Sequence, residues 1–459
     1  MRSACALLAL VLAAGCVAPD PITEDPTPPP DPEPPWPAWT HEPWVWEDES
    51  TQESVLALVD GYLDRDIPVG AVIIDSPWET AYNDFTWDPA LFPDPQGLVD
   101  GLHARDVRVF LWITQMVNVD AGQVWDEGVA GGYFMQEQEG DAGPAVLEWW
   151  KGDGALVDFA NPEAVDWWHG LMEPVLELGI DGWKTDGSDF LAAFAGWSPA
   201  AQRDIGRLEY SHSYYQDVFD HTRQVLGDDR LITSRPIDNY GIDLGGDGVA
   251  FTPRDITWAG WVGDQDADFS GIRAALLNFW HSAAYGYVVF GSDIGGYRED
   301  GSELGRTKEV LLRWAGLGAL SPVMENGGGG AHEPWRFDDE TVDIYRRFVE
   351  LHRALIPYLR REGARAVDEG TSLFDFIDLD RIDYRYLLGP DLFVQPVLEP
   401  GTTMQVRLPA GQWRWLFGDQ RELAGGQVLT LEVPLDAYPA FVRLDSRVAD
   451  DLAAWMSAN

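Results

Sequence analysis

The sequence predicts an α/β protein, a (β/α)8 TIM barrel followed by a small C-terminal all-β sandwich. Three observations support this prediction. Short apolar runs alternate with longer amphipathic stretches from about residue 42, short strands with tight turns replace this alternation after about residue 365, and acidic residues follow several of the apolar runs. The 459 residues exceed one ordinary core but suit one large and one small domain.

The predicted barrel covers residues 42–364. Runs rich in β-branched and aromatic residues indicate buried strands, which we expect at 67–78, 107–117, 155–163, 180–186, 230–236, 255–264, 287–296 and 319–330. Stretches with helical periodicity separate them, as at 94–106, 163–179, 210–227, 269–286 and 307–318. Strands alternating with helices indicate a parallel sheet, and eight such units fit a closed barrel. An open, doubly wound sheet is the alternative, although no G-x-G-x-x-G motif follows the first strand.

Residues 365–459 show a different pattern. Strand-like segments such as "YRYLLGPDLFVQPV" and "QVLTLEVPL" follow one another through Gly and Pro turns, with no long helical stretch between them. This pattern is typical of an all-β sandwich. The last residues, from "VADDLAAW" onward, predict a short terminal helix.

The N-terminal 16 residues predict a targeting segment. Arg2 precedes the apolar run "ALLALVLAAG", which is too short to span a bilayer and ends at Cys16. "LAAGC" resembles a bacterial lipobox, so we expect Cys16 to be lipidated and the protein to be extracytoplasmic, anchored to a bacterial membrane at the periplasm or cell surface. An ordinary secretory signal is the alternative. Cys5 would leave with the signal, so no disulfide is expected. Residues 17–41, rich in Pro and acidic residues, predict a disordered linker.

The charge balance limits the partners. Lys and Arg together number 31 against 77 Asp and Glu, a formal charge of −46. Such a surface repels nucleic acid and anionic membranes, so the lipid anchor is the expected membrane contact. A neutral carbohydrate is unaffected by this field. The sequence does not indicate an oligomeric state.

Polar residues gather at the ends of the predicted strands, where TIM barrels place their active sites. The set is Asp75, Asp186, Arg235, Asp264, Asp293 and Asn326. Two carboxylates suffice for glycoside cleavage, and the 22 tryptophans offer faces for stacking on sugars. This chemistry needs no cofactor and no metal.

Several motifs, in the same order, resemble glycoside hydrolase family 31, whose members include α-glucosidases, α-xylosidases and sulfoquinovosidases. The motifs include "GIDGWKTDGSDF", "WVGDQ", "GSDIGGY" and "DFANPEAVDWW", and the resemblance covers about residues 42–445. It implies a retaining, exo-acting α-glycosidase. Asp186 would be the nucleophile, and Asp264 the acid/base.

The resemblance also implies a set of binding residues. Asp75, Lys184 and Arg235 would hold the sugar in the −1 subsite. Trp78 and Trp261 would form walls of the site. Asn326, or His332 from the following loop, would stand where many members carry a hydroxyl-binding histidine.

The sequence departs from the family pattern in four places. The usual β-sandwich before the barrel is absent, Gly187-Ser188 replaces Phe-Gly, Asp189 replaces Glu, and the histidine near the eighth strand is replaced. The sugar therefore stays open. A catalytically silent sugar-binding lipoprotein and a transglycosylase on the same scaffold are alternatives. A metal-dependent hydrolase is another, with Asp75, Asp186, Asp264 and Asp293 as oxygen ligands.

Overall fold

The computed structural model of the protein describes residues 31–141, 143–187, 196–237, 252–377, 382–444 and 446–458. The folded unit begins at Glu33. The predicted signal segment with Cys16, and most of the predicted linker, lie outside the described residues. None of the described helices is both long and apolar enough to cross a membrane.

Eight parallel strands form the central sheet, in the order β12-β11-β10-β7-β3-β2-β1-β13. They are β1 (Trp44–Glu47), β2 (Ala71–Ile74), β3 (Arg108–Ile113), β7 (Gly182–Thr185), β10 (Leu231–Ser234), β11 (Ala259–Trp261), β12 (Phe290–Gly291) and β13 (Glu325–Asn326). A parallel bridge between Asp293 and Glu325 brings the two edges of the sheet together, and the Ile294 amide donates a 2.9 Å hydrogen bond to the Glu325 carbonyl. This near-closed sheet confirms the predicted barrel over the open-sheet alternative.

The predicted third strand, 155–163, is not a barrel strand. Its first residues belong to β6 (Gly152–Leu156), which pairs antiparallel with β4 (Met116–Asn118) and β5 (Val146–Trp149) in a small sheet inserted after β3. The first barrel strand is instead β1, which the predicted set lacks. A short apolar run does not reveal whether its partners are parallel or antiparallel, and β1 has only four residues.

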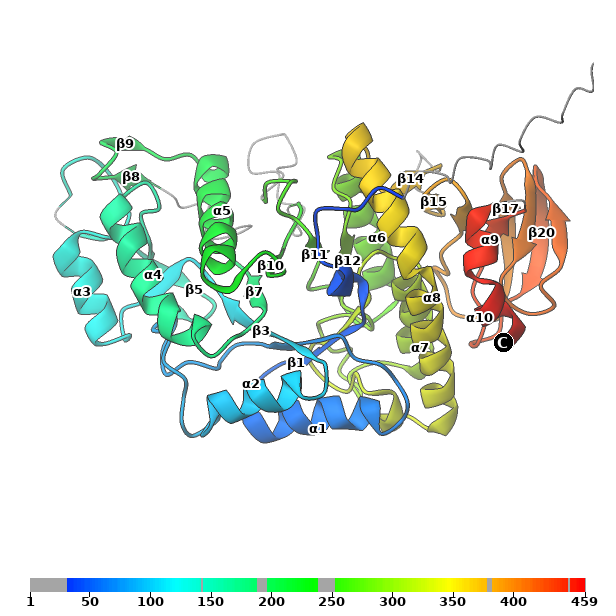
Figure 1. Ribbon diagram of the computed structural model, residues 1–459, viewed down its shortest axis with the longest axis horizontal. Helices are drawn as coiled ribbons and strands as arrows, with labels where there is room; N and C mark the ends of the chain where they lie inside the picture. Colours follow the sequence, from blue (N-terminus) through cyan, green and yellow to red (C-terminus); the bar gives the residue numbers. More distant parts are fainter. Residues whose placement is uncertain are drawn as a thin grey trace, which may run out of the picture. The chain divides into compact units, whose positions relative to one another are not determined.

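Helices follow the barrel strands (Figure 1). They are α1 (Gln52–Leu63), α2 (Pro95–His103), α4 (Pro162–Leu176), α5 (Arg207–Leu226), α6 (Phe269–Ala284), α7 (Lys308–Ala319) and α8 (Asp339–Glu369), with α3 (Gln123–Gly131) and the hairpin β8 (Trp197–Ser198) and β9 (Arg203–Asp204) outside this series. Carboxylates fix several starts: Asp94, Asp268 and Asp338 each accept hydrogen bonds from first-turn amides. The helices α1 and α2 lie side by side, as do α7 and α8.

The C-terminal part is all-β, as predicted. A six-stranded sheet has the order β14-β15-β16-β21-β18-β19, and β17 pairs with β20. The strands are β14 (Phe374–Phe376), β15 (Tyr386–Leu388), β16 (Leu392–Val394), β17 (Thr403–Leu408), β18 (Gln412–Trp415), β19 (Glu422–Ala424), β20 (Gln427–Glu432) and β21 (Ala440–Arg443), followed by α9 (Arg447–Asp451) and α10 (Ala453–Ala458). Arg313 of α7 ties this part to the barrel, because its guanidinium donates to four carbonyls, those of Gly401, Val433, Pro434 and Ala437.

The end of the predicted linker is folded, which corrects the expectation of disorder up to residue 41. The Trp36 side chain is buried, and its Nε1 donates a 2.9 Å hydrogen bond to His41. A short 3-10 helix, η1 (Ala38–His41), leads from it into β1. Apolar burial of one large indole outweighs the preference of a proline-rich segment for extended, solvated chain.

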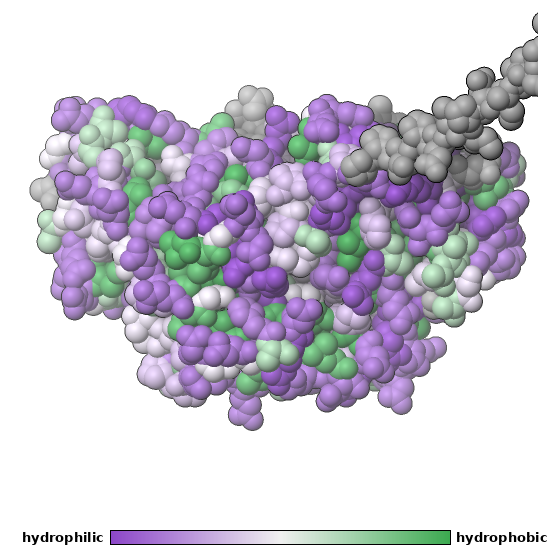
Figure 2. All heavy atoms as spheres, in the orientation of Figure 1, coloured by the Kyte–Doolittle hydropathy of each residue, from purple (hydrophilic) through white to green (hydrophobic). Residues whose placement is uncertain are grey.

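Figure 2 shows a mainly hydrophilic face on which hydrophobic side chains form small, separate areas. Beneath it, the barrel strands are almost wholly buried: all four residues of β2, of β7 and of β10 are buried. This rigid core holds the strand ends, and the side chains that follow them, in place.

Candidate active site

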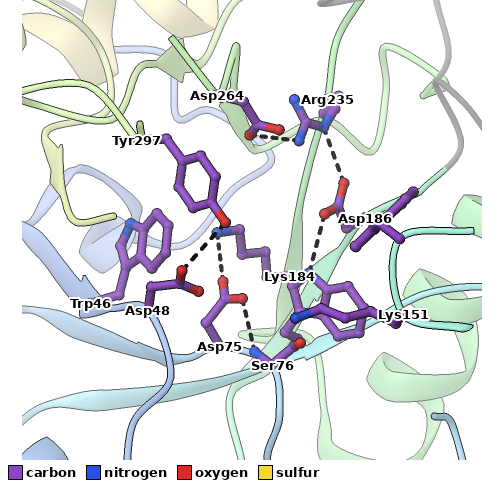
Figure 3. Close-up of a pocket in the computed structure, with 12 residues that line it drawn as sticks. Trp46, Asp48, Asp75, Ser76, Lys151, Lys184, Asp186, Arg235, Asp264 and Tyr297 are labelled. Atoms are coloured by element: carbon purple, nitrogen blue, oxygen red, sulfur yellow. Dashed lines mark hydrogen bonds and ion pairs between the residues drawn. The ribbon is translucent and has the colours of Figure 1, made fainter. Parts of the chain in front are cut away.

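A pocket of about 260 Å³ lies at the carboxyl ends of the barrel strands. The part of the chain that the structure describes contributes Trp46, Asp48, Asp75, Ser76, Trp112, Trp150, Lys151, Lys184, Asp186, Arg235, Asp264 and Tyr297 to its lining. Five of the nine predicted substrate-site residues therefore meet in one cavity (Figure 3). They are Asp75, Lys184, Asp186, Arg235 and Asp264.

Lys184 and Asp75 form a buried ion pair deep in the pocket. The Lys184 Nζ lies 2.8 Å from Asp75 Oδ2, and the backbone amide of Ser76 donates to the other carboxylate oxygen at 2.8 Å. The same ammonium lies 3.5 Å from the centroid of the Trp46 ring. Burial alone would lower the pKa of Lys184, but the carboxylates of Asp75, Asp293 and Glu325 outweigh it and raise this pKa. The lysine is a permanent cation.

Asp186 directly follows β7, at the point where this strand opens into the pocket. Arg235 Nε donates to Asp186 Oδ1 at 3.1 Å, and the amide of Gly187 donates to the same oxygen at 2.8 Å. Trp112 Nε1 donates to Oδ2 at 3.2 Å. Three donors on two oxygens fix the orientation of the carboxylate.

Arg235 also holds Asp264. Its Nη2 donates to Asp264 Oδ1 at 2.9 Å, so one guanidinium bridges both predicted catalytic carboxylates (Figure 3). Gly263, just before Asp264, has a φ of +40°, and a Cβ there would lie 2.5 Å from Arg235 Nη1. The glycine of the "WVGD" motif is therefore required by its backbone conformation and by the close approach of the arginine.

Four predicted site residues do not line the pocket. Trp78 is wholly buried and donates to the Trp112 carbonyl at 2.7 Å, so the prediction of a wall at Trp78 is corrected. Trp261 is also buried and packs behind the cations, with the Arg235 guanidinium carbon 4.8 Å from its ring centroid. A side chain at a strand end can point into the core as readily as into the site.

Asn326 and His332 bind each other rather than facing the pocket. Asn326 Nδ2 donates to the Tyr62 hydroxyl at 2.8 Å and to the His332 carbonyl at 3.1 Å. His332 Nδ1 lies 2.9 Å from the Ile294 carbonyl. Burial lowers the pKa of His332 far below its usual value, so this ring is neutral. Because successive strand residues alternate in direction, Glu325 faces the barrel interior and Asn326 faces outward to α1.

Several pocket residues are missing from the predicted set. Trp46 and Asp48 come from β1 and the residues that follow it, the strand that the periodicity did not reveal. Tyr297 closes "GSDIGGY", and its ring stacks on Trp46 with 6.0 Å between centroids. Trp150 and Lys151 come from the turn between β5 and β6, which nothing local in the sequence assigns to the pocket. Asp189, beside the predicted nucleophile, lies outside the described residues.

Two buried acids lie next to this site. Asp293 and Glu325 face each other across the bridge that closes the barrel, and Asp293 Oδ1 has no hydrogen-bond partner among the described residues. Burial raises the pKa of Glu325 to about 7, against the opposing charge of Lys184. Burial, followed by the charge of Glu325, raises the pKa of Asp293. The pair therefore retains protons at pH values where free carboxyls lose them.

Glu325→Gln should alter how stability depends on pH. The folded-state pKa of Glu325 is about 7, above the usual 4.5, so the folded protein binds more protons than the unfolded chain between these values. Its contribution to stability is present below pH 4.5 and is lost as pH rises through 7. As the pH rises from 5 to 8, the free energy of unfolding of the glutamine variant should therefore increase relative to that of wild type by on the order of 1–3 kcal/mol. Thermal unfolding at both pH values measures this difference.

The control is Glu53→Gln, an exposed acid in the first turn of α1. We expect the control to follow the wild-type pH dependence. If Glu325→Gln also follows wild type, Glu325 titrates in the folded protein as it does in the unfolded chain.

The pocket carboxylates do not form a metal-ligand set. Among the described residues, no group of three or more His, Cys, Asp or Glu side chains converges in a way that could hold a metal ion. Asp75 is engaged by Lys184, while Asp186 and Asp264 share Arg235. This arrangement does not match the metal-dependent alternative.

The comparisons with known proteins agree with this geometry. Residues 33–361 match the profile of the glycosyl hydrolases family 31 TIM-barrel domain, and residues 373–446 match that of the family 31 C-terminal domain. The chain therefore belongs to glycosyl hydrolase family 31.

Curated relatives include the 1,3-alpha-isomaltosidase of Kribbella flavida, which is 28% identical over 89% of this chain and 60% of its own length. The alpha-xylosidase XylQ of Lactiplantibacillus pentosus is 27% identical over 82% of this chain and 49% of its own length. Among solved structures, the dextranase of Flavobacterium johnsoniae in complex with glucose has a TM-score of 0.77 at 22% identity, covering 91% of this chain and 53% of that chain. The chain thus spans about half to three fifths of the length of these relatives.

Proposed function

We propose that the protein is a retaining, exo-acting α-glycosidase that removes a terminal α-linked sugar from oligo- or polysaccharides. The observation that carries the proposal is the single guanidinium of Arg235, which holds the Asp186 and Asp264 carboxylates side by side. Retaining enzymes need two carboxyl groups close together, about 5–5.5 Å apart. The names of the relatives, an isomaltosidase and a xylosidase, support the same class of reaction.

In the first step, a carboxylate oxygen of Asp186 attacks the anomeric carbon and the bond to the leaving oxygen breaks. Asp264 transfers its proton to that oxygen as the bond breaks. The Asp186 carboxyl group accepts hydrogen bonds from Arg235, Gly187 and Trp112, so the attacking oxygen is held in a fixed orientation. The product is a covalent glycosyl-enzyme and a free alcohol.

In the second step, Asp264 removes a proton from water, and the water oxygen attacks the anomeric carbon from the face that the first alcohol left. The bond to Asp186 breaks, which restores both carboxyl groups. Asp75 and Lys184, deep in the pocket, are placed to hold the sugar hydroxyls through charge-assisted hydrogen bonds. A cavity of about 260 Å³ is at the small end for ligand clefts and suits the end of a glycan chain.

The test is a screen of aryl α-glycosides with the purified full-length protein, followed by proton NMR of the first sugar released. We expect hydrolysis of at least one α-glycoside, with the α-anomer appearing before mutarotation. First release of the β-anomer would contradict the double displacement. Binding without turnover across the panel would favour the silent sugar-binding lipoprotein, and products longer than the substrate would identify a transglycosylase.

We also propose that Cys16 carries a lipid anchor that holds the protein on the outer side of a bacterial membrane. The support is the "LAAGC" sequence after a short apolar run. Expression in a bacterial host supplied with labelled palmitate should label the wild-type protein and leave Cys16→Ala unlabelled. Equal labelling of both proteins, or labelling of neither, would contradict the anchor.

A further inference from the structure

Lysine is rare in this chain, and its placement is uneven. The 459 residues contain three lysines, Lys151, Lys184 and Lys308, against 28 arginines. Two of the three, Lys151 and Lys184, line the candidate active site. Most of the lysines of this strongly acidic chain, whose formal charge is −46, therefore lie in the pocket.

Lys151 differs from the other pocket cations in having no carboxylate partner among the residues that the structure describes. Lys184 pairs with Asp75, and Arg235 pairs with Asp186 and Asp264. Outside the pocket, Lys308 lies within 2.9 Å of both Asp338 oxygens and 2.6 Å from Glu340. Over the described ranges, Lys151 forms no ion pair. Its ammonium lies 5.7 Å from the centroid of the Tyr82 ring. Its positive charge lowers the pKa of Asp48, against the larger opposite effect of burial.

The turn that carries Lys151 is held firmly. The Lys151 carbonyl accepts a 2.8 Å hydrogen bond from Asn118 Nδ2, and Asn118 Oδ1 accepts one of 2.7 Å from Trp149. The rings of Trp149 and Trp112 are nearly parallel, at 7°, and Trp112 donates to Asp186. The inserted β5–β6 turn is therefore tied to the predicted nucleophile through packed aromatic rings, and Lys151 lies among the pocket residues in Figure 3.

We propose that Lys151 binds an anionic substituent of the substrate, so that the preferred substrates are acidic α-glycosides carrying a carboxylate, sulfate or phosphate. This inference rests on the proposed function. The acidic surface and the pocket carboxylates repel such a substrate, so its binding requires a local cation, and no described carboxylate forms an ion pair with Lys151. A neutral sugar does not require an unpaired charge. The anionic group belongs either to the sugar in the deep part of the pocket or to the leaving group.

The test compares matched substrates on wild type, Lys151→Met, Lys151→Arg and Lys308→Met. The substrates are 4-nitrophenyl α-glucoside, 4-nitrophenyl α-glucuronide for an anionic sugar, and 3-carboxy-4-nitrophenyl α-glucoside for an anionic leaving group. The quantity measured is the ratio of kcat/KM for each anionic substrate to that for the neutral one, at low and high salt. Lys308→Met removes the same charge from a paired lysine that does not line the pocket.

We expect wild type to prefer one anionic substrate by about 10- to 100-fold at low salt, and this preference to shrink at high salt. Lys151→Met should lose the preference, Lys151→Arg should keep part of it, and Lys308→Met should match wild type. A wild-type ratio near one, or an unchanged ratio in Lys151→Met, would overturn the inference while leaving the glycosidase intact.

A binding measurement separates the two proposals. Tryptophan fluorescence titrations with glucuronate and glucose need no turnover. If no aryl glycoside is hydrolysed, the proposed function fails, and tighter glucuronate binding that Lys151→Met abolishes would still support anion recognition. Equal binding of the two sugars by wild type and Lys151→Met would reject an anionic group on the sugar, and a binding comparison of 3-carboxy-4-nitrophenol with 4-nitrophenol that also shows no difference would reject anion recognition.

Discussion

Asp186→Asn is expected to lower kcat for aryl α-glycosides by about 10⁴-fold or more, while the fold and the unfolding temperature stay close to those of wild type. An amide of the same shape keeps the oxygen that Arg235 and the Gly187 amide donate to and loses only the acceptor for Trp112 Nε1, so most of the hydrogen bonds that hold this side chain are conserved. The amide lacks the electron pair and the charge that form the bond to the anomeric carbon. Initial rates with a sensitive nitrophenyl substrate measure the loss.

The matched control is Asp166→Asn, which removes an exposed carboxylate from α4 and should keep wild-type rates. A second test uses Asp186→Gly with added azide. Azide attacks from the side of the missing carboxylate and should restore turnover as a β-glycosyl azide. Activity of Asp186→Asn within about tenfold of wild type would assign the nucleophile to another residue.

The residues that the sequence locates well are those that follow a barrel strand directly. Asp75, Asp186 and Arg235 come immediately after β2, β7 and β10, and the parallel sheet brings these strand ends to one edge. Lys184 lies within β7, two residues before Asp186, and its assignment comes from the family resemblance. Their positions depend on strand order and direction, which the alternation of strands and helices already specifies.

The residues that the sequence does not locate depend on tertiary packing. β1 is four residues long and follows a proline-rich segment, so Trp46 and Asp48 carry no periodic signal. Lys151 reaches the pocket only because β5 and β6 fold back antiparallel beside β4. No spacing along the chain encodes that return.

Side-chain direction is the other property that position along the chain leaves open. Trp78 ends the same predicted strand as Asp75, yet its indole fills the core under Trp112. On β13 a shift of one residue exchanges Glu325, beside Lys184, for Asn326, beside Tyr62. Gly327, the next residue, has no space for a side chain, because a Cβ there would lie 2.2 Å from the Trp46 ring. The indole of the unpredicted strand β1 therefore lies directly against the loop that follows β13.

Asp264→Ala should produce a loss that depends on the leaving group. A glycoside whose alcohol leaves only after protonation should lose about 10²–10⁴-fold in kcat/KM, because no other group donates that proton. A 2,4-dinitrophenyl α-glycoside, whose leaving group departs as an anion, should be cleaved at a rate much closer to wild type. The comparison of kcat/KM across a series of leaving groups measures the difference.

The same variant should accumulate the glycosyl-enzyme. With Asp264 gone, no base activates water, so the second step becomes slow while Asp186 still attacks activated substrates. Intact-protein mass spectrometry after mixing should detect the sugar on the protein, and azide should accelerate its release as an α-glycosyl azide. The control is Asp266→Asn, two residues away on the exposed side and paired with Arg298 at 3.4 Å, which should show neither effect. An equal loss on all leaving groups would mean that Asp264 positions Arg235 and transfers no proton.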